Sequence, residues 1–416
     1  MRKYSILRNA AMPQRGGAFT FGPVAGPAGI GLGGPGGAGA GGPLGQGLGE
    51  PPAPTIDVED LDSRGVRDVA RDPGVVEFAP VMPTKLIEPV EADASAAASA
   101  TTSDDAWGVG AVGADASSFT GQDVVVSVLD TGIDAAHVAF QGVSLVQKDF
   151  SGSGDGDQQG HGTHCAGTIF GRDVDGKRIG VARGVPRALI GKVLGDDGSG
   201  DSDMIFKGIQ WAAGEGAQVI SMSLGFDFPG FVDRLVNQFG WPVDLATSNA
   251  LEAYRGNLRM FDALMEMVRA RAAFDAGVVL VAAAGNESRR LVNPDFEIAA
   301  SLPAAANGIV SVGALQRDGG SLSIASFSNT FPRISAPGVG ITSARAGGGL
   351  RDLNGTSMAC PHVAGVAALW WEAVRTMGLP ATAHTVMARL LASARTDVID
   401  DNVDIADRGV GIVAAP

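Results

Sequence analysis

Ser357 lies where a flexible segment meets a strongly apolar one. Gly355 precedes it closely, and residues 363–371 contain only apolar side chains and one glycine. A segment that is apolar on every face is typical of a buried helix, and Pro361 is expected in its first turn, where a missing N–H costs little. Free N–H groups at a helix start stabilise negative charge, which suits a serine that forms an oxyanion by attacking a carbonyl. Taken alone, the position fits a capping serine better.

Two further stretches supply the groups that a serine nucleophile needs. Residues 124–129 form an apolar run, typical of a buried strand, that ends at Asp130. His161 opens the glycine-flanked, small-residue run 160–168. A histidine beside Ser357 would take the hydroxyl proton and return it to the leaving amine, and Asp130 would orient the imidazole. Asp, His and Ser follow one another in one of the chain orders known for convergent triads, so the pattern predicts peptide-bond hydrolysis.

The same three stretches resemble the signatures of the subtilisin-like serine proteases, the subtilases. They read Asp-Thr-Gly-Ile-Asp at 130–134, His-Gly-Thr-His-Cys-Ala-Gly-Thr at 161–168 and Gly-Thr-Ser-Met-Ala-Cys-Pro-His at 355–362. The likeness runs from about Trp107 to the end of the chain. It implies an α/β fold of three layers, α/β/α, with a mostly parallel central sheet, and a serine endopeptidase that cleaves polypeptide substrates through an acyl-enzyme.

The resemblance also assigns the residues that bind the oxyanion and the substrate. Asn286 matches the family's oxyanion asparagine, which would act with the Ser357 N–H. Glu287 would lie at the rim of the primary specificity pocket and attract a cationic side chain, or else pair with Arg289 or Arg290. The two edges between which the substrate adds as a strand match Gly198, Ser199, Gly200, Ser223, Leu224 and Gly225, and one pocket wall matches Ala283, Ala284 and Gly285. Because that wall is small, we expect a large side chain to fit.

The chain has only two cysteines, Cys165 and Cys360, and both lie inside these motifs. Cys165 follows His161 by four residues, so both project from one helix face, as in the proteinase K-like branch that the motif resembles. His161, His164 and Cys165 also suggest zinc ligands, but no second ligand cluster appears, so we predict no metal there. His164 and His362 are expected to be packed structural histidines.

Calcium stabilises many subtilases. Asp155-Gly156-Asp157 and Asp196-Asp197-Gly198 offer oxygen atoms, but neither has a defined ligand register, so we expect solvated acidic loops. No cofactor is predicted to be required.

Composition restricts the class of partner and the compartment. The formal net charge of −14 over 416 residues argues against nucleic acid and anionic membranes as partners. No apolar run is long enough to span a bilayer, and the basic start at residues 1–8 lacks a signal-peptide core. Two cysteines suit a reducing compartment, so we expect a cytoplasmic enzyme.

Apolar runs alternate with helical stretches after Trp107, which is typical of a parallel sheet covered on both faces. Active sites of such sheets lie at the carboxyl ends of strands, where Asp130 and Asn286 are placed. The predicted strands are 124–129, 189–194, 219–224, 278–284 and 309–312, and the predicted helices are 164–170, 203–214, 252–276 and 357–376.

Residues 1–106 precede the predicted catalytic domain, 107–416, and divide into three parts. Residues 1–54 are dominated by Gly, Pro and Ala and predict a disordered tail. Residues 55–92 predict a strand at 55–58, a helix at 63–71 and a strand at 75–81. They resemble the end of a subtilase propeptide, and a small structured linker or a degenerate remnant is the alternative. Residues 93–106 form a linker, with a processing site expected within 94–103. The chain's own N-terminal segment is therefore a candidate partner of the site.

Residues 226–250 form an insertion relative to common subtilases. It is aromatic and predicted to be rich in loops, which would suit a lid or docking surface, although packing over the following helix is the favoured interpretation. Such a surface could exclude water, so a maturation protease or peptide cyclase is an alternative function. A pseudoprotease that only binds peptides is a second alternative, opposed by the intact Asp130, His161, Ser357 and Asn286.

Overall fold

The computed structural model describes residues 1–9, 54–91, 106–271 and 275–416. The Gly/Pro-rich stretch 10–53 and almost all of the predicted linker, with its expected processing site, lie outside the described residues. No helix within the described ranges is both long and apolar enough to cross a membrane.

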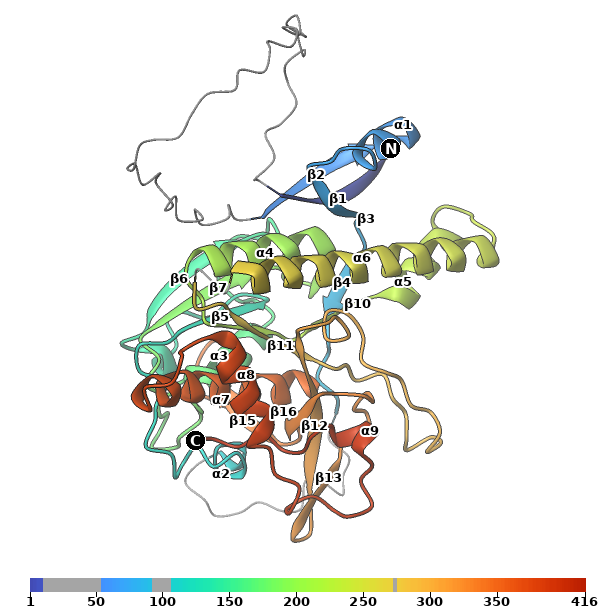
Figure 1. Ribbon diagram of the computed structural model, residues 1–416. Helices are drawn as coiled ribbons and strands as arrows, with labels where there is room; N and C mark the ends of the chain where they lie inside the picture. Colours follow the sequence, from blue (N-terminus) through green and yellow to red (C-terminus); the bar gives the residue numbers. More distant parts are fainter. Residues whose placement is uncertain (10–53, 92–105, 272–274) are drawn as a thin grey trace, which may run out of the picture.

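An eight-stranded sheet forms the centre of the catalytic domain (Figure 1). Its strands run in the order β13-β12-β11-β9-β5-β7-β6, and β14 pairs with β12 beside that path. All pairings are parallel except that of β12 with β13. The strands are β5 (Val125–Asp130), β6 (Ser144–Asp149), β7 (Arg187–Lys192), β9 (Val219–Met222), β11 (Val279–Ala283), β12 (Val310–Asp318), β13 (Ser321–Ile324) and β14 (Ile334–Pro337).

Helices cover both faces of this sheet, so the predicted three-layer α/β/α architecture is confirmed (Figure 1). On one face, α3 (His161–Phe170) and α7 (Thr356–Thr376) contact the strands, and α8 (Ala383–Ala392) packs on α7. On the other face lie α4 (Ser202–Gly214) and the long α6 (Val243–Arg271). Two buried apolar clusters fill the two interfaces. The nearly continuous apolar strands follow from this burial on both faces.

The N-terminal residues correct the predicted domain boundary. Arg2–Arg8 form strand β1, so the disordered tail predicted for residues 1–54 is wrong for these residues. β1 is the central strand of a three-stranded antiparallel sheet with β2 (Thr55–Leu61) and β3 (Val75–Pro80), and α1 (Ser63–Val69) joins the other two. Ile6 and Leu7 are fully buried, which explains why this short run is ordered although a glycine-rich stretch follows.

The resulting small domain, residues 2–8 and 55–80, packs on the exposed side of α4 and α6 (Figure 1). Asn257 of α6 donates to the Pro80 carbonyl over 2.8 Å, and Arg259 forms an ion pair with Glu77 at 3.5 Å. The chain then continues through β4 (Pro83–Leu86) into the catalytic domain.

The insertion at 226–250 is mostly helical, so the prediction of a loop-rich segment is wrong. The carboxylate of Asp227 caps helix α5 (Phe228–Asn237), and Pro229 stands in the first turn, where its missing N–H costs little. Phe231 and Leu235 are buried, and α5 packs on α6. The favoured interpretation of packing over the following helix is therefore confirmed. The described part of α6 runs from Val243 to Arg271, so the helix begins earlier than the predicted helix 252–276, and residues 275–276 lie outside it.

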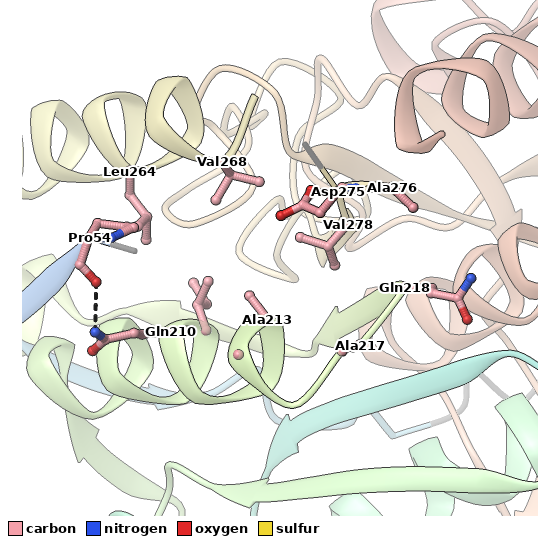
Figure 2. A pocket seen from close by; sticks show the side chains of 14 residues that line it. Pro54, Gln210, Ala213, Ala217, Gln218, Leu264, Val268, Asp275, Ala276 and Val278 are labelled. Carbon is pink, nitrogen blue, oxygen red and sulfur yellow. Dashed lines mark hydrogen bonds between the residues drawn. The ribbon is translucent and has the colours of Figure 1, made fainter. Parts of the chain in front are cut away.

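A hollow of about 200 Å³ lies between α4 and α6 (Figure 2). Its lining includes Leu264, Val268 and Val278, and Gln210 at its edge donates to the Pro54 carbonyl over 2.7 Å. Gln218 and Val278 precede β9 and β11, so the hollow lies at the amino ends of these strands. The residues predicted for catalysis follow carboxyl ends, which separates this hollow from the candidate active site.

Candidate active site

Asp130 and His161 meet at the carboxyl end of the central strand β5. The His161 Nδ1 atom lies 2.8 Å from Asp130 Oδ1, and both side chains are fully buried. The Thr131 N–H donates to the same carboxylate oxygen at 2.8 Å. His161 Nε2 has no hydrogen-bond partner among the described residues. The carboxylate thus fixes the tautomer and leaves Nε2 available as a base.

The start of α3 is fastened to the loop after β5. Asp157 accepts from Thr131 Oγ1 at 2.8 Å and from the N–H groups of Gly160 and Thr163. Gly162 is required for the close approach, because a Cβ there would lie 2.2 Å from the Gly132 carbonyl oxygen. These contacts hold the imidazole against Asp130, and sequence reasoning did not find Asp157 in this role.

Ser357 lies in the first turn of α7, as predicted, with Gly355 at the cap position. Pro361, however, is inside the helix and not in its first turn, because the helix already begins at Thr356. A proline cannot donate to the carbonyl four residues earlier, and here that carbonyl belongs to Ser357. It accepts instead from Cys165 Sγ at 3.4 Å and Ser223 Oγ at 3.2 Å. Because Pro361 leaves the Ser357 carbonyl free, that carbonyl bonds to Cys165 of α3 and to Ser223, which follows β9.

Asn286 is oriented by the residue before the serine. Its Oδ1 accepts from the Thr356 N–H at 2.9 Å and from Thr356 Oγ1 at 2.8 Å. The amide nitrogen therefore points away from Thr356, and it donates to the Glu88 carbonyl at 2.9 Å. Gly355 is needed here, since a Cβ would lie 2.9 Å from that nitrogen. The only sequence signal for Thr356 was its hydroxyl beside that of Ser357.

Strand β4 occupies the groove between the two predicted edges. It pairs antiparallel with β8 (Ser199–Asp201) on one side and with β10 (Leu224–Phe226) on the other. The Leu86 N–H also donates to the Gly198 carbonyl at 2.8 Å. The predicted edges, Gly198, Ser199, Gly200, Leu224 and Gly225, all contact this strand, whereas the side chain of Ser223 turns to Ser357.

The chain runs past the serine without leaving the groove. Ser357 Oγ donates to the Ile87 carbonyl at 3.0 Å. The Ile87 side chain is buried beside Gly225, where an added Cβ would approach it to 3.5 Å. Beyond the serine, Val90 donates to the Asn354 carbonyl and accepts from Asn354 Nδ2, both at 2.8 Å. The chain's own residues 83–90 therefore lie where a substrate is predicted to bind, and Asn354 is a contact that sequence reasoning missed.

Ala283, Ala284 and Gly285, the predicted pocket wall, are buried at the end of β11. Glu287 next to them is exposed, and its carboxylate accepts from Asn329 Nδ2 at 2.7 Å. Arg290 pairs with Glu297 and Asp407, so its predicted pairing with Glu287 is wrong. Among the described residues, no ion pair joins Glu287 to Arg289 either.

The thiols of Cys165 and Cys360 and the imidazoles of His164 and His362 are all buried. Cys165 Sγ lies 3.7 Å from His161 Nδ1, and burial raises the pKa of its thiol well above the usual range. Burial likewise raises the pKa of Cys360 to about 11. Burial lowers the pKa of His164 to about 3 and that of His362 to about 4, as expected of packed histidines.

Asp130, His161 and Cys165 form a cluster with ligand atoms within 4.8 Å of one another. A zinc ion would need the Cys165 thiolate and a free His161 nitrogen, but burial raises the pKa of that thiol and Nδ1 already bonds to Asp130. In the predicted acidic loops, Asp196 accepts from Lys192, and Asp197 accepts from Ser199.

Comparison with known proteins agrees with this geometry. A family model described as the subtilase family matches residues 121–412. The chain is 32% identical over 323 residues to the subtilisin-like serine protease Pen ch 13 of Penicillium rubens, covering 74% of this chain and 67% of that protein. It is 31% identical over 326 residues to subtilisin-like protease 1 of Trichophyton rubrum, covering 74% of this chain and 53% of that protein. The chain belongs to the subtilase family and is a serine-type endopeptidase.

Proposed function

We propose that Asp130, His161, Ser357 and Asn286 hydrolyse peptide bonds, and that residues 83–90 block the groove until the chain cleaves itself after Ile87. The observation that carries the proposal is the 3.0 Å contact of Ser357 Oγ with the Ile87 carbonyl, on a strand paired with both groove edges. An inhibitory role for the N-terminal segment follows from its position, because a substrate would have to displace it.

Each residue has one task in the reaction. His161 Nε2 takes the Ser357 proton as Oγ attacks the carbonyl carbon, and the same nitrogen then protonates the leaving amine. Asp130 holds the imidazole by its 2.8 Å bond to Nδ1 and stabilises the cation that forms. Asn286 Nδ2 and the positive end of α7 stabilise the oxyanion. Water then releases the acyl group by the reverse proton transfers.

The test is the intact mass of the purified full chain, wild type and Ser357→Ala. We expect the wild type to lose residues 1–87 and the variant to stay whole, with a melting temperature close to that of the uncut wild type. A fluorophosphonate probe should label only the wild type. Labelling of the variant at another serine, or its processing in the absence of other proteases, would contradict the role of Ser357.

The mass also decides where the chain is cut. Removal of residues 1–87 supports the position of Ile87 at the serine, whereas cleavage within 94–103 would place the processing site in the linker. The comparisons do not favour a peptide cyclase or a pseudoprotease. Product masses would distinguish the cyclase from the hydrolase, because hydrolysis adds water to the substrate and cyclisation does not.

A further inference from the structure

We propose that Asp227 makes the enzyme select a lysine or arginine at the third residue before the cleaved bond. The inference rests on the proposed function, since it takes residues 83–87 as a guide to how substrates bind. Asp227 belongs to the insertion after Gly225 that sets this chain apart from common subtilases, so the selectivity would be a property of this chain.

The register of β4 identifies the subsite. Thr84 lies opposite Gly200 and Lys85 opposite Gly225, which places Ile87 at the serine and Lys85 two residues earlier. The Lys85 ammonium lies 3.0 Å from Asp227 Oδ1. Side chains alternate along a strand, so a substrate residue at this position would point its side chain the same way.

Asp227 is held beside the groove strand by two contacts. Its N–H donates to the Pro83 carbonyl at 3.1 Å, which lengthens the substrate ladder by one bond. Its carboxylate caps α5 by accepting from the Gly230 N–H at 3.2 Å. Gly230 permits this close contact, because a Cβ there would collide with the carboxylate. A charge held in place loses little side-chain freedom on binding, which favours a specific pairing.

The size of the effect follows from exposure. The Lys85 side chain is 47% exposed and that of Asp227 is 25% exposed, so solvent screens the pair. Ion pairs of this kind contribute up to about 1 kcal/mol, which corresponds to a preference of roughly two- to fivefold for lysine over glutamine. The preference should disappear in about 1 M salt, where the Debye length is about 3 Å.

The experiment uses the full chain after it has processed itself, with four quenched fluorescent peptides. Each peptide has the sequence of residues 82–90, with Lys, Arg, Gln or Glu in the place of Lys85. The ratio of kcat/KM between the Lys and Gln peptides is measured for wild type, Asp227→Asn and Asp233→Asn. Asn at 227 keeps an oxygen that caps α5. Asp233, exposed on the same helix, gives a control with an equal change in net charge.

We expect the Lys-to-Gln ratio of kcat/KM to be two- to fivefold in wild type and Asp233→Asn, and close to one in Asp227→Asn. In wild type, the Glu peptide should have the lowest kcat/KM of the four. Equal hydrolysis of all four peptides by the wild type would overturn the inference alone, as would a ratio that survives Asp227→Asn. A processed chain that cleaves none of the peptides would overturn the proposed register and the inference together.

Discussion

Thr84 places a hydroxyl in the groove that has no hydrogen-bond partner among the described residues. Its side chain is 1% exposed, and the strand lies close to Gly200. A buried hydroxyl without a partner costs about 1–3 kcal/mol relative to water. Thr84→Val removes that hydroxyl and nearly keeps the shape, so it should stabilise the N-terminal segment in the groove. We take about 1–2 kcal/mol as the net gain, because the added methyl is slightly larger.

The assay separates cleavage from release. Gel electrophoresis follows cleavage of the full chain, and a fluorogenic peptide follows the activity that appears when the cleaved segment dissociates. A gain of about 1–2 kcal/mol should lengthen the delay between the two by roughly five- to thirtyfold. Thr55→Val, an exposed threonine on β2 outside the groove, is the matched control and should leave the delay unchanged. A shorter delay for Thr84→Val would refute the reasoning, because steric cost would then exceed the penalty of the buried hydroxyl.

Three further predictions concern buried and charged groups around the site. Mercurials should inhibit the enzyme slowly through Cys165, whose Sγ lies 3.7 Å from His161 Nδ1. Inhibition should vanish in Cys165→Ala and persist in Cys360→Ala, and full activity with mercurated Cys165 would contradict this prediction. In substrates that carry Lys or Gln just before the cleaved bond, Glu287→Gln should lower the Lys-to-Gln ratio of hydrolysis by up to about fivefold at low salt. A ratio unchanged by the mutation and by salt would show that Glu287 does not touch the substrate. Burial lowers the pKa of His362 to about 4 in the folded chain, against about 6.5 in the unfolded chain, so the unfolded state binds a proton first and stability should fall as the pH drops from 6.5 toward 4. In the Ser357→Ala background, His362→Gln should therefore reduce the loss of unfolding free energy between pH 7 and 5 by about 2 kcal/mol. Equal losses in both proteins would refute the assignment.

The central sheet and the site could be predicted because their signals are local. Residues 124–129 are apolar except for Ser127, and Asp130 with its carboxylate follows directly, so strand and site come from one short stretch. Asn286 follows shortly after β11 (Val279–Ala283). The pairing of these strands and the meeting of Asp130 with His161 follow from the order of motifs, which the resemblance to subtilases supplied.

The N-terminal strand could not be predicted in the same way. Arg2–Arg8 pair with residues 55–61 and 75–80, and the stretch between β1 and β2 carries no pattern that indicates this pairing. Helix α5 was missed because Asp227, Pro229 and Gly230 read as a turn, although the first caps the helix and the second suits its first turn. For β1 the tertiary partner, and not the local sequence, determines the structure, whereas α5 carries its start signals locally.

The bonds at the serine explain how an intact segment can remain in an assembled active site. Ser357 Oγ donates its proton to the Ile87 carbonyl, whereas attack requires that proton to point to His161 Nε2. The Asn286 amide meanwhile binds the carbonyl of Glu88, one residue beyond the bond that faces the serine. Cleavage therefore needs two small changes: rotation of the hydroxyl toward the imidazole, and transfer of the Asn286 bond from the Glu88 to the Ile87 carbonyl. Val90, bound twice by Asn354, resists the second change because it holds the chain on the far side of the serine. The fit of the segment in the groove thus hinders its own cleavage, with the catalytic residues already in place.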